Sequence, residues 1–185
     1  MSNERYKTGK VTLREHLNGL DQNSKASAEE IASLLPRMKK RFANLGYHKT
    51  SRSDMLVLEY IKMIFDTQDY RCTHWLQTSD DQLNGVWNRP GTGYCLWKKK
   101  TVHYEIDHVY PVNSGGKDDL KNFQFLSANA NQFVKCSLTY EDLLKRIDLS
   151  KALKRRIKKV LKRREKLFAS KKWEKYIDKI TKFEK

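Results

Sequence analysis

Two neighbouring residues, Asp107 and His108, are the first sign of chemistry in this sequence. They end a short β-like run, His103 to Val109, and Pro111 follows closely, a residue that cannot continue a central strand. Their polar side chains are therefore expected at the end of a strand. A carboxylate there could hold Mg²⁺ or Mn²⁺, and an imidazole that is largely neutral near pH 7 could take a proton from water.

A second polar group follows on a predicted helix. Ser127 is a plausible helix N-cap, and Ser127, Asn131 and Lys135 recur every four residues, so they share one helix face. A face that carries a hydroxyl, an amide and an ammonium group is not a core face. We expect it to look back at the strand end, which would gather carboxylate and amide oxygens, an imidazole and a cation around one centre.

The segments between these residues must bring them together. The loop Asn113 to Asp119 contains Gly115-Gly116 among Asn, Ser and Asp residues, a composition typical of a chain reversal. A short apolar run, Asn122 to Leu126, then returns as a second strand. The order strand, loop, strand, helix predicts an α+β fold in which the first strand's end meets the helix.

Three stretches together resemble the HNH endonuclease family with its ββα-metal fold. They are Glu105-Ile-Asp-His-Val-Tyr-Pro111, then Gly115-Gly-Lys-Asp-Asp-Leu-Lys-Asn-Phe-Gln-Phe-Leu126, and then the pair Asn131 and Lys135. The resemblance extends from Tyr70 to Lys135, about a third of the chain. An Asp-His pair alone more often caps a turn than catalyses a reaction, whereas this combination at these spacings favours a nuclease centre.

The resemblance implies a role for each matching residue. Asp107 and Asn131 would bind one Mg²⁺ or Mn²⁺ ion, and His108 would be the general base. Asn122 would brace the loop so that His108 points at the attacking water. Lys135 would lie near the scissile phosphate, although its spacing from Asn131 is one residue longer than in the usual pattern.

Two further residues, His103 and Glu105, alternate with Asp107 on one face of the first strand. They could be read as extra metal ligands. We favour structural or substrate-side roles for both.

A structural zinc site is not favoured. Zinc-containing relatives carry two Cys-x-x-Cys pairs, but here Cys72 is followed three residues later by Trp75, and the helix positions hold Ser127 and Ala130. This excludes a Cys₄ site. A mixed Cys and His site has poor spacing, and ordinary buried or free thiols are favoured over it; its ligands would be Cys72, His74, Cys95 and Cys136.

Composition indicates a polyanionic partner. The 185 residues include 38 Lys and Arg against 22 Asp and Glu, a net charge of +16, which favours DNA. No segment resembles a membrane span or a signal peptide, and three widely spaced cysteines suit a reducing compartment, so we expect a cytoplasmic protein.

The chain divides by pattern into a polar arm (1–26), an N-terminal helical segment (27–69), the HNH core (70–138) and a basic helical extension (139–185). Ser27-Ala-Glu-Glu30 has the spacing of a capping box, and Pro36 is expected to kink or divide the helix that follows. A second helix is predicted from Ser53 or Asp54 to Asp66. Helices are also predicted after Thr139, Ser150 and Ser170.

Positive charge is concentrated in the extension. From Lys151 onward, 16 Lys and Arg face 4 Asp and Glu. A charge run is usually a solvated face, but beside a nuclease centre it favours a DNA-binding surface. The predicted DNA contacts are Arg89, Lys98, Lys99 and Lys100 around the centre and Arg155, Lys158, Lys159, Lys162 and Arg163 in the extension.

The sequence therefore predicts a metal-dependent HNH endonuclease that cuts DNA, acting as a monomer or a homodimer. Its architecture resembles phage or mobile-element homing and nicking enzymes. Two alternatives remain open. One is a non-catalytic nucleic-acid-binding protein on an HNH scaffold, and the other is a toxin-like nuclease.

Overall fold

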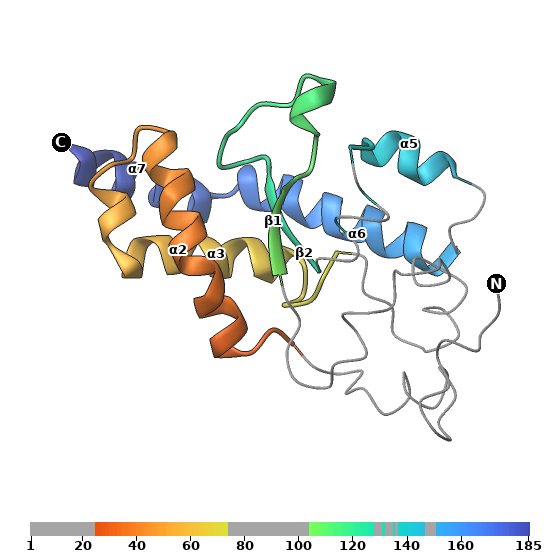
Figure 1. The fold of residues 1–185 in the computed structure, drawn as a ribbon, viewed down its shortest axis with the longest axis horizontal. Coiled ribbons are helices and arrows are strands. Elements are labelled where there is room, and N and C mark those ends of the chain that lie inside the picture. The colour runs from red at the N-terminus through yellow and green to blue at the C-terminus, as the bar shows by residue number, and fades with distance from the viewer. Residues whose placement is uncertain (1–24, 74–103, 128–130, 132–134, 136, 147–150) are drawn as a thin grey trace.

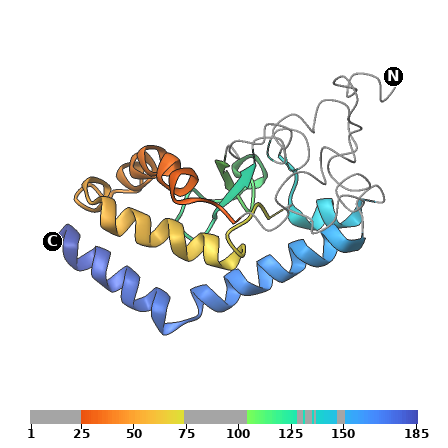
Figure 2. The ribbon, with the colours of Figure 1, turned by 90° about the horizontal axis from the view of Figure 1, so that it is seen from below.

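Helix α3 lies at the centre of the part of the chain that the structure describes. The computed structural model describes residues 25–73, 104–127, 131, 135, 137–146 and 151–185. Helix α2 crosses α3 on one side, and α6 and α7 run along another (Figure 1; Figure 2). The order is α2 (Ala28–Asn44), η2 (Thr50–Arg52), α3 (Asp54–Thr67), β1 (Tyr104–His108), η5 (Val112–Ser114), β2 (Phe123–Ser127), α5 (Tyr140–Lys145), α6 (Lys151–Phe168) and α7 (Lys171–Glu184), where η marks a short 3₁₀ helix.

Helix α2 begins with the predicted capping box. The backbone N–H of Ser27 donates to Glu30 Oε2 at 2.8 Å, and the N–H of Glu30 donates to Ser27 Oγ at 3.1 Å. Pro36 was expected to kink or divide this helix; the division is wrong, because α2 is continuous through Pro36, and the kink stays a prediction. Proline removes only one intrahelical donor, and burial of the apolar stripe on both sides of it holds the helix together. The buried residues of that stripe are Ile31, Leu34, Met38 and Phe42.

Helix α3 is buried over most of its circumference, as expected for a helix that is apolar on nearly every side. Tyr60 is its largest fully buried side chain, and its ring meets Phe42 of α2 and Trp173 of α7 at centroid distances of 5.3 and 6.4 Å. Phe65 meets Phe125 of β2 at 4.7 Å. One hydrophobic core therefore joins α2, α3, the hairpin and α7.

The C-terminal helices form a shallow V beneath α3 (Figure 2). Ser170 caps α7 as predicted by accepting a hydrogen bond from the N–H of Trp173. Tyr176 Oη donates to the Leu56 carbonyl oxygen at 3.1 Å, and Glu184 accepts from the N–H of Thr50 at 2.6 Å. Helix α7 is thus fixed to the N-terminal helices at several points. Of the helices described, none combines the length and the apolar composition that crossing a membrane requires.

Strands β1 and β2 pair antiparallel, with Tyr104 opposite Ser127 and His108 opposite Phe123. This confirms the α+β class with a small two-stranded sheet. Ser127, expected as a helix N-cap, is the last residue of β2. The hairpin is anchored to the helices because Tyr60 Oη donates to the Leu120 carbonyl at 2.8 Å and Arg37 Nη2 donates to the Tyr104 carbonyl at 2.6 Å.

Candidate active site

Asp107 lies near the end of β1 and is partly buried. Gln124, its partner across the hairpin, donates from Nε2 to Asp107 Oδ2 at 2.9 Å. Burial raises the pKa of Asp107, and the nearby Lys135 ammonium opposes that rise only in part. The protein therefore holds a carboxylate where its negative charge is poorly solvated, a setting that favours an added cation.

Gln124 links Asp107 to the rest of the core. Its side chain has no exposed surface, and its amide oxygen accepts hydrogen bonds from Tyr140 Oη at 2.7 Å and Thr73 Oγ1 at 3.3 Å. With the oxygen turned toward two hydroxyl donors, the amide nitrogen must face Asp107. Residues before and after the hairpin thus set the orientation of the carboxylate.

His108, the last residue of β1, lies against the loop that joins the strands. Its Nε2 is 2.8 Å from Asp118 Oδ1, and its ring centroid is 5.2 Å from that of Phe123. The side chain is 16 % exposed. The predicted base is therefore partly open to solvent and in contact with an acidic residue.

Asn122 holds the two ends of the loop together. Its Oδ1 accepts from the N–H of Tyr110 at 2.8 Å, and its Nδ2 donates to the carbonyls of Tyr110 at 2.8 Å and Lys117 at 2.7 Å. The conformation of this loop also requires its two glycines. Gly115 has φ +93°, and a Cβ at Gly116 would lie 2.0 Å from the Tyr110 carbonyl oxygen. This geometry supports the bracing role proposed for Asn122.

Asn131 and Lys135 are helical and approach the hairpin. Asn131 Nδ2 donates to Glu105 Oε2 at 2.7 Å, so its amide oxygen faces away from Glu105. Lys135 has no exposed surface; its Nζ donates to the Leu138 carbonyl and lies 5.2 Å from the Tyr140 ring centroid. The predicted place of Lys135 beside a phosphate stays a prediction, and in this structure its ammonium lies inside the protein.

The available donors suit a hard divalent cation. The Asp107 carboxylate and the Asn131 amide oxygen are the ligand types that Mg²⁺ and Mn²⁺ prefer, and the raised pKa of Asp107 reflects a charge that a cation would stabilise. Within the described residues, no three His, Cys, Asp or Glu side chains come together as metal ligands. Such a site would rely on few protein ligands, with water completing the coordination, as is usual for Mg²⁺.

The exposed basic residues of α6 form a stripe opposite its buried face. Lys158, Lys159 and Lys162 are exposed, whereas Leu153, Ile157 and Val160 are buried. We call this surface the α6 stripe; it consists of the exposed residues Arg155, Lys158, Lys159, Lys162 and Lys166 together with the half-buried Arg163.

Not every arginine of α6 points outward. Arg164 is buried, donates from Nη2 to the Lys121 carbonyl at 2.9 Å and covers the Phe168 ring, and burial lowers its pKa. Arg156 donates from Nη2 to the carbonyls of Gln68 and Cys72 at 2.8 and 2.9 Å. These two residues connect α6 to the α3 end and to the hairpin loop, so they are structural.

Several predicted residues lie outside the described part of the chain. Among the proposed DNA contacts these are Arg89, Lys98, Lys99 and Lys100, and among the alternative zinc ligands they are His74, Cys95 and Cys136. Cys72 is described and is a buried free thiol.

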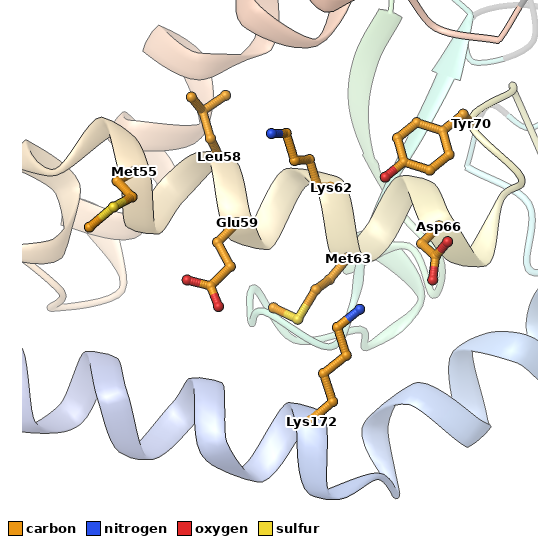
Figure 3. A pocket seen from close by; sticks show the side chains of 8 residues that line it. All are labelled: Met55, Leu58, Glu59, Lys62, Met63, Asp66, Tyr70 and Lys172. Carbon is orange, nitrogen blue, oxygen red and sulfur yellow. The ribbon is translucent and has the colours of Figure 1, made fainter.

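A separate pocket of about 640 Å³ lies away from these residues, between α3 and α7 (Figure 3). Lys172 extends from α7 toward Met63 and Asp66 of α3 (Figure 3). Side chains of both charges and apolar side chains line the pocket, and its described lining comes from α3, the turn at Tyr70 and α7. It plays no part in the candidate active site.

Sequence reasoning missed the partners of the predicted residues. Gln124 could have been found from the strand register, because it lies opposite Asp107. Asp118 lies in the stretch from Gly115 to Leu126, and the sequence alone indicates no role for it. No sequence signal links Arg41 of α2 to this loop, yet its Nη1 lies 3.6 Å from Asp118 Oδ1.

The hairpin, the braced Gly-Gly loop and the helical residues that follow are consistent with the ββα core of an HNH domain. Residues 93–132 match the family model of the HNH endonuclease, so this chain contains an HNH segment at the position of the hairpin. HNH nucleases act on DNA and generally use a divalent metal, which supports a nucleic-acid partner. Searches of curated proteins and of solved structures found no match to the chain.

Proposed function

We propose that this protein is a metal-dependent endonuclease that hydrolyses phosphodiester bonds of DNA. The observation that supports it most is the hairpin, in which Asp107 and His108 lie together at the end of β1 beside a loop braced by Asn122. These residues fall within or beside the HNH segment. Asn131 reaches the same hairpin from the following helical residues.

Each residue has a chemical role in the proposal. His108 accepts a proton from the attacking water, and Asn122 holds the loop that keeps His108 at the strand end. Asp107 and Asn131 would hold one Mg²⁺ or Mn²⁺ ion, which would withdraw charge from the phosphate and its leaving oxygen. Gln124 fixes the direction of the Asp107 carboxylate. Lys135 is proposed to supply positive charge near the scissile phosphate.

DNA is proposed to bind along the α6 stripe and around the centre, at Arg89, Lys98, Lys99 and Lys100. The stripe presents several cations at helical spacing on one exposed face, which suits contacts to successive phosphates. The chain's net charge of +16 would also speed association with DNA.

Cleavage of supercoiled plasmid tests the proposal. We expect Mg²⁺ or Mn²⁺ to convert the plasmid to nicked or linear forms, EDTA to stop the reaction, and His108→Ala to abolish it while DNA binding persists. His48→Ala is the matched control, because His48 is exposed and lies outside the hairpin. The ratio of nicked to linear product would assign a nicking activity, as in the homing and nicking enzymes that the architecture resembles, or paired double-strand cleavage.

A non-catalytic nucleic-acid-binding protein is the second candidate. The observation that favours it is the α6 stripe, whose exposed charges do not depend on the hairpin. It predicts salt-dependent binding with no metal-dependent cleavage, and no difference between wild type and His108→Ala. A toxin-like nuclease would instead cleave RNA or bulk DNA in the same assay.

A further inference from the structure

The contact between His108 and Asp118 joins the predicted base to the middle of the loop. Nε2 of the ring lies 2.8 Å from Oδ1 of the carboxylate, a strong hydrogen-bond distance. The His108 side chain is 16 % exposed and that of Asp118 is 37 % exposed. The contact is therefore accessible to solvent, and other neighbours must hold it in place.

Arg41 provides that support from outside the HNH segment. Its Nη1 is 3.6 Å from Asp118 Oδ1, and its guanidinium carbon lies 5.7 Å from the Phe123 ring centroid. Phe123 in turn packs against the His108 ring at 5.2 Å. His108, Asp118, Arg41 and Phe123 thus form a ring of contacts in which each side chain touches the next. Such a network restricts the imidazole more than a single exposed ion pair could.

We propose that Asp118, held by Arg41, is a positioning residue for His108; this inference rests on the proposed nuclease function. A carboxylate can only accept a hydrogen bond, so its contact selects the neutral tautomer with the proton on Nε2. The other ring nitrogen, Nδ1, is then the one that accepts a proton from water. Helix α2 thereby becomes part of the nuclease site through Arg41.

The tautomer can be measured without any cleavage assay. Two-bond ¹H–¹⁵N correlation spectra of the full chain at about pH 8, where imidazoles are ordinarily neutral, separate the Nε2–H and Nδ1–H forms. The His108 signals are assigned among the five histidines by their loss in His108→Gln. We expect wild type to show the Nε2–H form. Asp118→Asn should give a mixture, because an amide can both donate and accept.

Asp119→Asn is the matched control. It removes the same charge one residue away, and its amide oxygen can still accept from the N–H of Lys121, as Asp119 Oδ1 does at 2.6 Å. We expect this variant to keep the wild-type tautomer and the wild-type kcat. Asp118→Asn should lower kcat by roughly 10- to 100-fold with little change in KM, the range typical of groups that orient a functional imidazole. Arg41→Gln should lower kcat by about two- to fivefold, the worth of a partly exposed ion pair.

The outcomes separate the two proposals. A tautomer mixture together with a kcat loss in Asp118→Asn, but not in Asp119→Asn, supports the positioning role. An unchanged tautomer in Asp118→Asn, or equal kcat values for the two variants, overturns it. A wild type that cleaves no nucleic acid refutes the proposed function and the catalytic consequence of the contact, while the spectra still decide whether Asp118 orients the ring.

Discussion

Replacing Asn122 by Ala should loosen the loop between β1 and β2, which follows His108 and contains Asp118. The substitution removes three hydrogen bonds, two to Tyr110 and one to Lys117, with distances of 2.7–2.8 Å. A typical intramolecular hydrogen bond contributes about 0.5–1.5 kcal/mol, and Asn122 is only partly buried, so the lower part of the summed range applies. We expect a loss of about 2 kcal/mol in the free energy that holds the loop closed.

Hydrogen exchange at the Tyr110 amide measures that loss directly, because this N–H donates to Asn122 Oδ1. A loss of about 2 kcal/mol corresponds to roughly 30-fold faster exchange. Urea unfolding followed by circular dichroism shows whether the whole domain loses the same free energy or the loop opens by itself. Cleavage should fall in parallel, since His108 precedes this loop and Asp118 lies in it.

Asn113→Ala is the matched control, because Asn113 is an exposed asparagine in the same loop. It should leave the exchange rate of Tyr110 and the unfolding curve close to wild type. If Asn122→Ala and Asn113→Ala show equal protection at Tyr110, the bracing role of Asn122 is refuted.

Three further predictions follow from the structure. Glu184→Gln should cost about 1 kcal/mol in urea unfolding near pH 7. Burial acts to raise the pKa of Glu184, but hydrogen bonds from N–H groups at the start of η2 outweigh that effect and lower the pKa. The extra stability of the wild type over Glu184→Gln should therefore vanish as pH falls through the lowered pKa. For Asp107 the sign is opposite, because burial raises its pKa in the folded state. In EDTA, the stability of Asp107→Asn relative to wild type should therefore increase as pH rises from about 4 through the raised pKa. A difference that stays constant with pH would contradict the raised pKa. Replacing both Lys158 and Lys162 by Gln should weaken DNA binding. The slope of the logarithm of the binding constant against the logarithm of the salt concentration should fall in magnitude by about 1 for each lost phosphate contact. Lys182→Gln on α7 is the control and should leave this slope unchanged.

Local signals in the sequence were enough to place the helices and the hairpin. The capping residues Ser27, Thr139 and Ser170 each precede a helix as predicted, because a cap is a contact within one turn. The two strands were predicted within one residue at each end, since turn residues and apolar runs bound them. The helix predicted after Ser150 begins at Lys151 as expected, and Ser150 itself lies outside the described residues.

Contacts between distant segments could not be predicted in the same way. Arg164 has the same helical spacing as the buried residues of α6, which are Leu153, Ile157 and Val160. Because it is basic, the sequence indicated only that it adds to the positive charge of the extension. Its burial depends on the Lys121 carbonyl, which only the folded chain brings near. Arg41 and Asp118 also lie far apart in the sequence, and only the folded chain brings them into contact.

The docking of α7 also bears on how the protein folds during synthesis. The ring of Trp173 lies 4.8 Å from Phe168 and 6.4 Å from Tyr60, and Tyr176 and Ile180 are buried in the same cluster. Helix α7 is made after the hairpin, so a nascent chain that already contains the complete HNH segment still exposes the apolar side of α3. Such an intermediate presents a surface to which chaperones can bind, and the hairpin and helices reach their final packing only when α7 emerges and covers Tyr60.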